Sequence, residues 1–67
     1  MAGKLLPAQH VADLLGTPVK TLYYWRERGE GPPSFKIGHR VVYRETALDA
    51  WIAEQEAATI RGANTPN

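Results

Sequence analysis

Residues 14–29, LLGTPVKTLYYWRERG, contain the end of one amphipathic helix, a turn, and the start of a second helix. Gly16 supplies the backbone freedom that a sharp helix end needs. Thr17 places a capping hydroxyl directly before Pro18, a residue that the first turn of a helix tolerates. The second helix is therefore predicted over 18–28, and the whole segment has the pattern of a helix-turn-helix.

The segment before the turn is predicted to form the first helix, over 7–15. Apolar residues recur there at helical spacing, and two alanines fill in beside them; the set is Val11, Leu14 and Leu15 with Ala8 and Ala12. This stripe predicts one buried face, with the polar residues Gln9, His10 and Asp13 directed outward.

The segment after the second helix is predicted to be a loop followed by a hairpin. Residues 29–34, GEGPPS, favour neither helix nor strand, because glycine and proline weaken both. Beyond them, Phe35, Ile37, Val41 and Tyr43 alternate with Lys36, Val42 and Arg44 around a turn at Gly38–His39. The alternation predicts a two-stranded ribbon whose first set of side chains packs on the helices.

A third helix is predicted over 45–57, because Leu48, Trp51 and Ile52 repeat the helical spacing, and Trp51 is expected to anchor the core. The fold class is therefore mainly α with a small β-hairpin: a winged helix-turn-helix of three helices plus a two-stranded wing. We expect this domain to span residues 1–58, and a polar C-terminal tail, residues 59–67, to be disordered.

Length and composition restrict the function. A domain of 67 residues buries only about 60% of its unfolded surface, so a deep catalytic cleft is not expected. The chain has no cysteine, membrane-length apolar run or signal peptide, which predicts a soluble protein of the cytoplasm. We expect no enzyme activity, cofactor, small-molecule ligand or metal site; His10 and Asp13, three residues apart on one helix, would need a further ligand.

Charge is unevenly distributed, although the net charge is only +1. Residues 18–44 carry six basic and two acidic side chains, whereas residues 45–67 carry one basic and four acidic side chains. This asymmetry predicts that the middle of the chain addresses a polyanion and that the last helix does not.

Two surfaces are candidates for that contact. In a helical projection of 18–28, Leu22 points inward between Val19 and Trp25, which leaves Lys20, Thr21, Tyr24 and Arg28 on exposed positions that can donate to phosphates and base edges. At the hairpin turn, His39 and Arg40 form a cationic tip suited to the minor groove. Arg26 is expected to extend along the edge of the core.

Residues 6–52 resemble the small MerR-like winged-helix family, which includes phage and mobile-element excisionases and short transcription regulators. The matching segments are HVADLLG, TLYYW, PPSFKIGHRVVYR and ALDAWI. The resemblance implies that Lys20, Thr21, Tyr24 and Arg28 enter the major groove of double-stranded DNA and that His39 and Arg40 reach the adjacent minor groove. Thr17, Tyr23, Lys36 and Arg44 are then assigned to the DNA backbone. Pro18, where relatives have serine, and Arg26, where many have an apolar residue, depart from the family pattern.

The resemblance covers both excisionases and regulators, and our leading hypothesis is an excisionase, which assembles on attachment-site DNA and directs an integrase towards excision, with side-by-side self-association on the DNA. The alternative is a small transcription regulator with the same domain. A protein-binding module, with Tyr23 and Tyr24 as anchors, is the remaining alternative.

Overall fold

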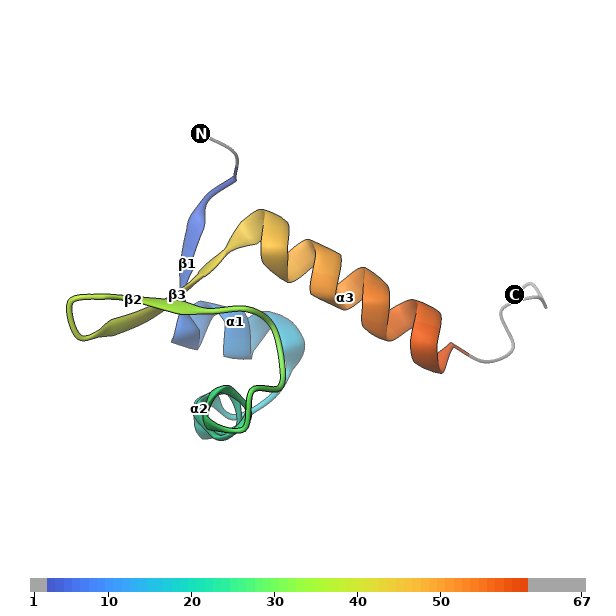
Figure 1. Ribbon diagram of the computed structural model, residues 1–67, viewed down its shortest axis with the longest axis horizontal. Coiled ribbons are helices and arrows are strands. Elements are labelled where there is room, and N and C mark those ends of the chain that lie inside the picture. The colour runs from blue at the N-terminus through green and yellow to red at the C-terminus, as the bar shows by residue number, and fades with distance from the viewer. Residues whose placement is uncertain (1–2, 61–67) are drawn as a thin grey trace.

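The structure, a computed structural model, describes residues 3–60 and contains three helices and one small sheet (Figure 1). In chain order the elements are β1 (Leu5–Pro7), α1 (Ala8–Leu15), α2 (Val19–Glu27), β2 (Phe35–Ile37), β3 (Arg40–Arg44) and α3 (Glu45–Thr59). This architecture is that of a winged helix-turn-helix, so the fold class predicted from the sequence is confirmed.

The turn between α1 and α2 forms at the predicted glycine. Gly16 closes α1 with φ 70°, and the N–H of Thr17 then donates to the carbonyl of Ala12 at 3.0 Å. However, α2 starts one residue later than predicted: Pro18 is its N-cap, with extended backbone, and no side chain caps the helix. The predicted Thr17 cap is therefore wrong, because the extended Pro18 moves the start of the helix beyond the reach of that hydroxyl.

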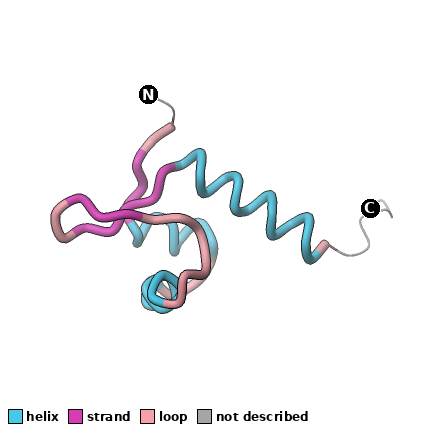
Figure 2. The backbone as a smooth tube through the Cα atoms, in the orientation of Figure 1, coloured by secondary structure: helices cyan, strands magenta, loops and turns pink. Residues whose placement is uncertain are grey.

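The sheet has three antiparallel strands in the order β1-β3-β2 (Figure 2). Strand β1 is not predicted from the sequence, and Pro7, predicted as the first residue of the first helix, lies elsewhere. Pro7 is instead the last residue of β1 and the N-cap of α1. Proline fits this position because β1 is an edge strand, where a missing N–H leaves no gap in the ladder. Pairing of Leu6 with Tyr43 fixes the start of the chain against the hairpin.

The register of the hairpin corrects the predicted division of its side chains. The turn at Gly38–His39 is confirmed, and it pairs Ile37 with Arg40, Lys36 with Val41, and Phe35 with Val42. Paired residues of an antiparallel sheet share a face, so the two-residue turn puts Phe35 and Ile37 on the opposite face from Val41 and Tyr43. The prediction that all four pack on the helices is therefore wrong.

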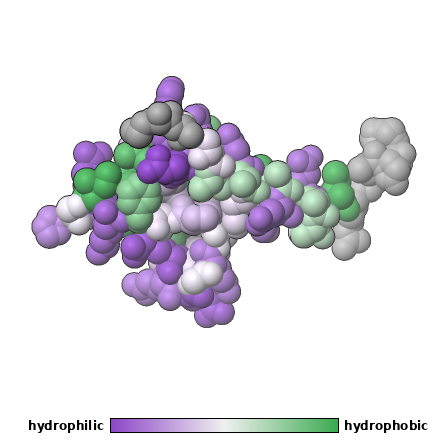
Figure 3. Space-filling model, turned by 45° about the horizontal axis from the view of Figure 1, so that its top comes forward, coloured by the Kyte–Doolittle hydropathy of each residue, from purple (hydrophilic) through white to green (hydrophobic). Residues whose placement is uncertain are grey.

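The two faces of the sheet differ accordingly. Val41, Tyr43 and Leu6 are buried against the helices. On the outer face Phe35 and Ile37 are 37% and 51% exposed, and they lie with the exposed Leu5 around Val42, which is buried. In the view of Figure 3, hydrophobic colour gathers over the strands at the left, and the lower lobe is mainly hydrophilic.

The core lies between α1, α2, α3 and the inner face of the sheet. Its fully buried large side chains are Val11, Leu22, Tyr43 and Leu48. On α1 the buried stripe comprises Ala8, Val11 and Ala12, with Leu15 packed beside it, whereas Leu14 is 61% exposed. The predicted core position of Leu14 is wrong because the helix turns its alanines, not Leu14, towards the sheet and α2.

Helix α3 leaves the end of β3 and extends away from the rest of the domain (Figure 1). Leu48 is buried and Trp51 packs on the core, as predicted, but Ile52 is 39% exposed because it lies beyond the sheet. The helix ends at Thr59, two residues later than predicted. Of the predicted tail, residues 61–67 lie outside the described residues.

Candidate nucleic-acid interface

Helix α2 presents a polar, aromatic face to solvent. Leu22 is buried and Val19 and Trp25 pack beside it, so the opposite side of the helix is free. Lys20 is exposed there and Tyr24 is 58% exposed, while Thr21 is half-buried at the edge. A helix with donors on one free face has the shape and chemistry that the major groove admits.

Arg28, at the C-cap of α2, is held by two neighbours. Its guanidinium lies 5.4 Å from the centre of the Tyr24 ring, and its Nε is 3.4 Å from Oε2 of Glu30. Both charged side chains of the ion pair are about half exposed, so the pair contributes at most about 1 kcal/mol. The guanidinium of Arg28 thus lies between Tyr24 and Glu30, an arrangement that the sequence does not predict.

The wing carries its cations on two different faces. His39 and Arg40 are exposed at the turn, where Gly38 adopts φ 62°. Lys36 pairs with Val41 and so belongs to the face directed at the helices, whereas Arg44 lies on the outer face with its guanidinium 5.7 Å from the centre of the Phe35 ring. Lys36 and Arg44, which the sequence analysis assigned to one role, are therefore not brought together.

Two hollows between α2 and the wing meet at Tyr23, which is 44% exposed. The first, of about 330 Å³, extends to the start of α1 and to Arg40, and the second, of about 370 Å³, lies between α2 and Lys36. His39 lines both hollows. The structure thus brings Tyr23, Lys36, His39 and Arg40 around a groove made of these two adjoining hollows.

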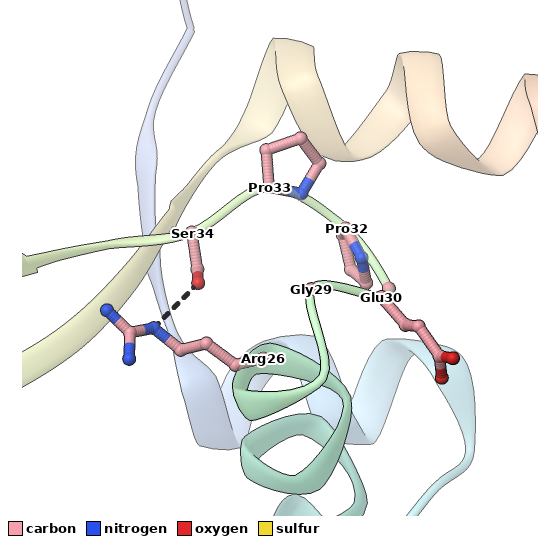
Figure 4. Close-up of a pocket in the computed structure, with 7 residues that line it drawn as sticks. Arg26, Gly29, Glu30, Pro32, Pro33 and Ser34 are labelled. Carbon is pink, nitrogen blue, oxygen red and sulfur yellow. Dashed lines mark hydrogen bonds between the residues drawn. The ribbon is translucent and has the colours of Figure 1, made fainter.

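Arg26 connects α2 to the segment that leads into the wing. Its Nε donates to Oγ of Ser34 at 3.0 Å across the loop of residues 29–34 (Figure 4). Burial raises the pKa of the Tyr43 hydroxyl above the usual 10.0, and the nearby Ser34 side chain opposes that rise. The sequence does not predict the bond between Arg26 and Ser34; its signal is the chain's one serine, placed directly before β2.

Thr17 lies directly before Pro18, the N-cap of α2. Its Oγ1 is buried and finds no hydrogen-bond partner among the described residues. In this geometry the hydroxyl is not presented to a phosphate, although the residue lies at the start of α2 as the sequence analysis expected.

No metal or membrane element emerges from residues 3–60. Among them no three histidine, cysteine, aspartate or glutamate side chains cluster as metal ligands. Asp13, the proposed partner of His10, accepts a hydrogen bond from Nε2 of Gln9 at 3.1 Å. Within the same range no helix is both long and apolar enough to cross a bilayer.

Comparison with known proteins gives one positive finding. A family described as a helix-turn-helix domain matches residues 5–56, which is most of the chain and includes both helices of the turn, the whole sheet and most of α3. Neither a curated protein nor a solved structure matches the chain. The matched range contains every residue of the groove described above.

Proposed function

The chain belongs to this helix-turn-helix family of DNA-binding domains, and from that premise we propose that it is a sequence-specific, excisionase-like protein that binds double-stranded DNA. In this proposal it binds near the attachment sites of an integrase and directs recombination towards excision. It makes and breaks no bond itself, and domains of this kind are typically non-enzymatic.

The observation that carries the proposal is the exposed face of α2 beside a cationic wing. Lys20, Thr21, Tyr24 and Arg28 would contact base edges in the major groove, and His39 and Arg40 would enter the neighbouring minor groove. Tyr23 and Lys36 would contact the sugar-phosphate backbone of the DNA between these two grooves. The proposal leaves out Thr17, because its hydroxyl is buried, and Arg44, because it lies on the outer face of the sheet.

The excisionase role is supported by the family, which falls in the group of excisionase-like helix-turn-helix domains. An integrase is then the expected protein partner, with copies of the chain bound side by side on the DNA. A small transcription regulator would use the same surface and differ in where its DNA site lies.

The test is a selection of binding sites from random duplex DNA, followed by titration of the selected site at several salt concentrations. We expect direct repeats about one helical turn apart, and the same sites should lie between recombinase sites in the element that encodes the protein. Sites over a promoter would replace the excisionase role with the regulator, and weak binding without sequence preference would contradict both.

The matched variants are Lys20→Gln and Lys4→Gln. Each removes one positive charge, but Lys20 lies on the exposed face of α2 and Lys4 lies next to the start of α3, where its carbonyl accepts from the N–H of Glu45. K20Q should lose affinity and K4Q should keep it. Equal losses would show that binding follows total charge rather than the proposed face.

A further inference from the structure

Arg26 has donors that its neighbours in the fold do not use. A guanidinium carries five N–H donors, and Nε of Arg26 uses one of them on Ser34. Within residues 3–60, Ser34 is the one group that accepts a hydrogen bond from this side chain. Figure 4 shows the two terminal nitrogens pointing away from the proline loop, and Arg26 is half-buried.

Arg26 is one of the residues that line the hollow of about 370 Å³ between α2 and β2. Its lining is cationic and donor-rich: Arg26, Lys36, His39 and Tyr23 surround it, against one acidic side chain, Glu27, and the apolar Val41. A guanidinium fork matches two oxygens of one phosphate, which makes arginine more selective for that geometry than lysine.

The position of the hollow indicates which phosphate would occupy it. If α2 lies in the major groove and the wing in the adjacent minor groove, the sugar-phosphate strand that separates these grooves must pass between the two elements. The hollow is the space between them. Accordingly, a phosphodiester of the bound DNA, with a single negative charge, is the ligand that the geometry favours.

We propose that this hollow binds one DNA phosphate and that Arg26 is its main ligand, through the two terminal nitrogens. The same side chain joins α2 to the segment that enters the wing, because its Nε donates to Oγ of Ser34, the residue directly before β2. The guanidinium is thus ordered before DNA arrives, so that little conformational entropy is lost on binding. This inference rests on the proposed function and adds to it a residue outside the contacts assigned above.

The test uses the whole chain and a set of duplexes of its selected site, each with one phosphate replaced by an uncharged methylphosphonate. For the native chain, neutralising the phosphate in the hollow should weaken binding on the order of tenfold. Arg26→Gln should be weaker on the unmodified duplex and insensitive to that one replacement, but should respond like the native chain at every other phosphate. Its salt slope should also fall by about one.

Three variants separate the phosphate contact from a purely structural role. Arg26→Lys keeps the charge but loses the fork, so it should keep part of the sensitivity at that phosphate. Ser34→Ala frees the guanidinium but leaves it present, so it should bind several-fold more weakly overall with the sensitivity retained. Lys4→Gln should match the native chain at every position. Unfolding curves of each variant show that folded proteins are compared.

The outcomes distinguish this inference from the proposed function. Failure of the native chain to bind any duplex would overturn both. The other outcome is that the native chain binds with sequence preference and Arg26→Gln stays fully sensitive to replacement of every phosphate. That outcome would overturn only the role of Arg26. If Arg26→Gln does not fold, Arg26→Lys tests the contact instead. An Arg26→Lys protein with the affinity of the native chain and the same sensitivity to each phosphate replacement would overturn the bidentate contact.

Discussion

Helices α2 and α3 rest on the same core but present opposite charge to solvent. Trp25 of α2 and Trp51 of α3 face each other with ring centres 6.0 Å apart and an angle of 44° between the rings. Away from that contact, α2 carries Lys20 and Arg26 against Glu27, whereas α3 has four acidic residues and no basic residue: Glu45, Asp49, Glu54 and Glu56. Burial alone would not distinguish the two helices, and their outward charge is the difference on which the proposed DNA contact of α2 rests.

The difference also extends to how each helix starts. The N–H of Glu45, the first residue of α3, donates to the carbonyl of Lys4 at 2.8 Å, and the carboxylate of Glu45 lies in the first turn, where the helix dipole favours it. Neither helix has a side-chain cap, and α2 has no acidic residue in its first turn. The start of α3 is therefore joined to the residue before β1 and carries a favourable charge, whereas the start of α2 has neither feature.

The largest effect should come from breaking the shared core. Leu22→Ala and Leu48→Ala each remove a side chain that is 1% or 2% exposed, and each should lower the free energy of unfolding by about 3 kcal/mol. Urea unfolding followed by circular dichroism measures this. Leu14→Ala, at a position that is 61% exposed, is the control and should change little. A small loss for Leu48→Ala alone would mean that α3 does not share the core of α2.

The next largest effect should be on DNA affinity, and it should distinguish the exposed face of α2 from that of α3. Tyr24→Ala should weaken binding to the selected site by about 2 kcal/mol and relax its sequence preference, because the ring is exposed and held by Arg28. Ile52→Ala, on the exposed side of α3, should leave both affinity and preference unchanged. Competition binding with single-base variants of the site measures both quantities. Intact preference in a folded Tyr24→Ala protein would contradict the assignment of α2.

Much of the fold was predictable because its signals are local. Gly16 and Gly38 lie at the predicted turns with positive φ, and the spacing of Leu22 and Leu48 put them in the core. What failed depends on pairing between distant segments. A period of two defines two sets of side chains in the hairpin, but only the two-residue turn decides that Phe35 joins Val42 rather than Val41. Similarly, β1 exists only because Leu6 meets Tyr43, 37 positions away in the sequence.

The candidate site was predictable to a similar degree. Helical projection identified Lys20, Tyr24 and Arg28 as exposed, because that periodicity is a property of one element, but Thr21, which it also placed there, is half-buried. The projection also placed Arg26 at the edge of the core. It did not identify Ser34 as the partner of Arg26, because the loop that brings Ser34 near has a course that the sequence does not define. The same limit applies to Thr17, whose hydroxyl is buried by contacts that a cap pattern does not describe.

Alkaline pH should lower the stability of the core that α2 and α3 share, through the buried side chain of Tyr43. Burial raises the pKa of this hydroxyl in the folded chain above the 10.0 of an unfolded tyrosine, so the unfolded state loses its proton first as the pH rises. Stability from this group is therefore complete below pH 10 and is lost as the pH rises from there through the folded pKa. Urea unfolding at pH 8 and pH 10.5 should show a loss for the native chain that is smaller in Tyr43→Phe. Equal losses in the two proteins would contradict this explanation.

A smaller effect is expected at the start of α2. Thr17→Val replaces a buried hydroxyl that has no partner among the described residues by a methyl group of the same shape, which should stabilise the chain by about 1 kcal/mol. Urea unfolding measures the gain. A loss of stability would show that the hydroxyl is paired in solution, and a loss of DNA affinity without a loss of stability would return Thr17 to the backbone contacts.

The smallest effect should come from the charge of α3. Glu54→Gln with Glu56→Gln removes two negative charges from the part of the helix that extends away from the sheet. If this helix does not touch DNA, the charges act only through solvent, where screening is strong beyond about 8 Å at physiological salt. Affinity should then rise about twofold at low salt for any duplex sequence, and the difference should vanish near 0.15 M salt. Lys20→Gln should instead lose affinity at both salt concentrations, because its charge is at the contact. A gain from the α3 variant that depends on DNA sequence and persists at high salt would place α3 against the DNA and remove the distinction between the two helices.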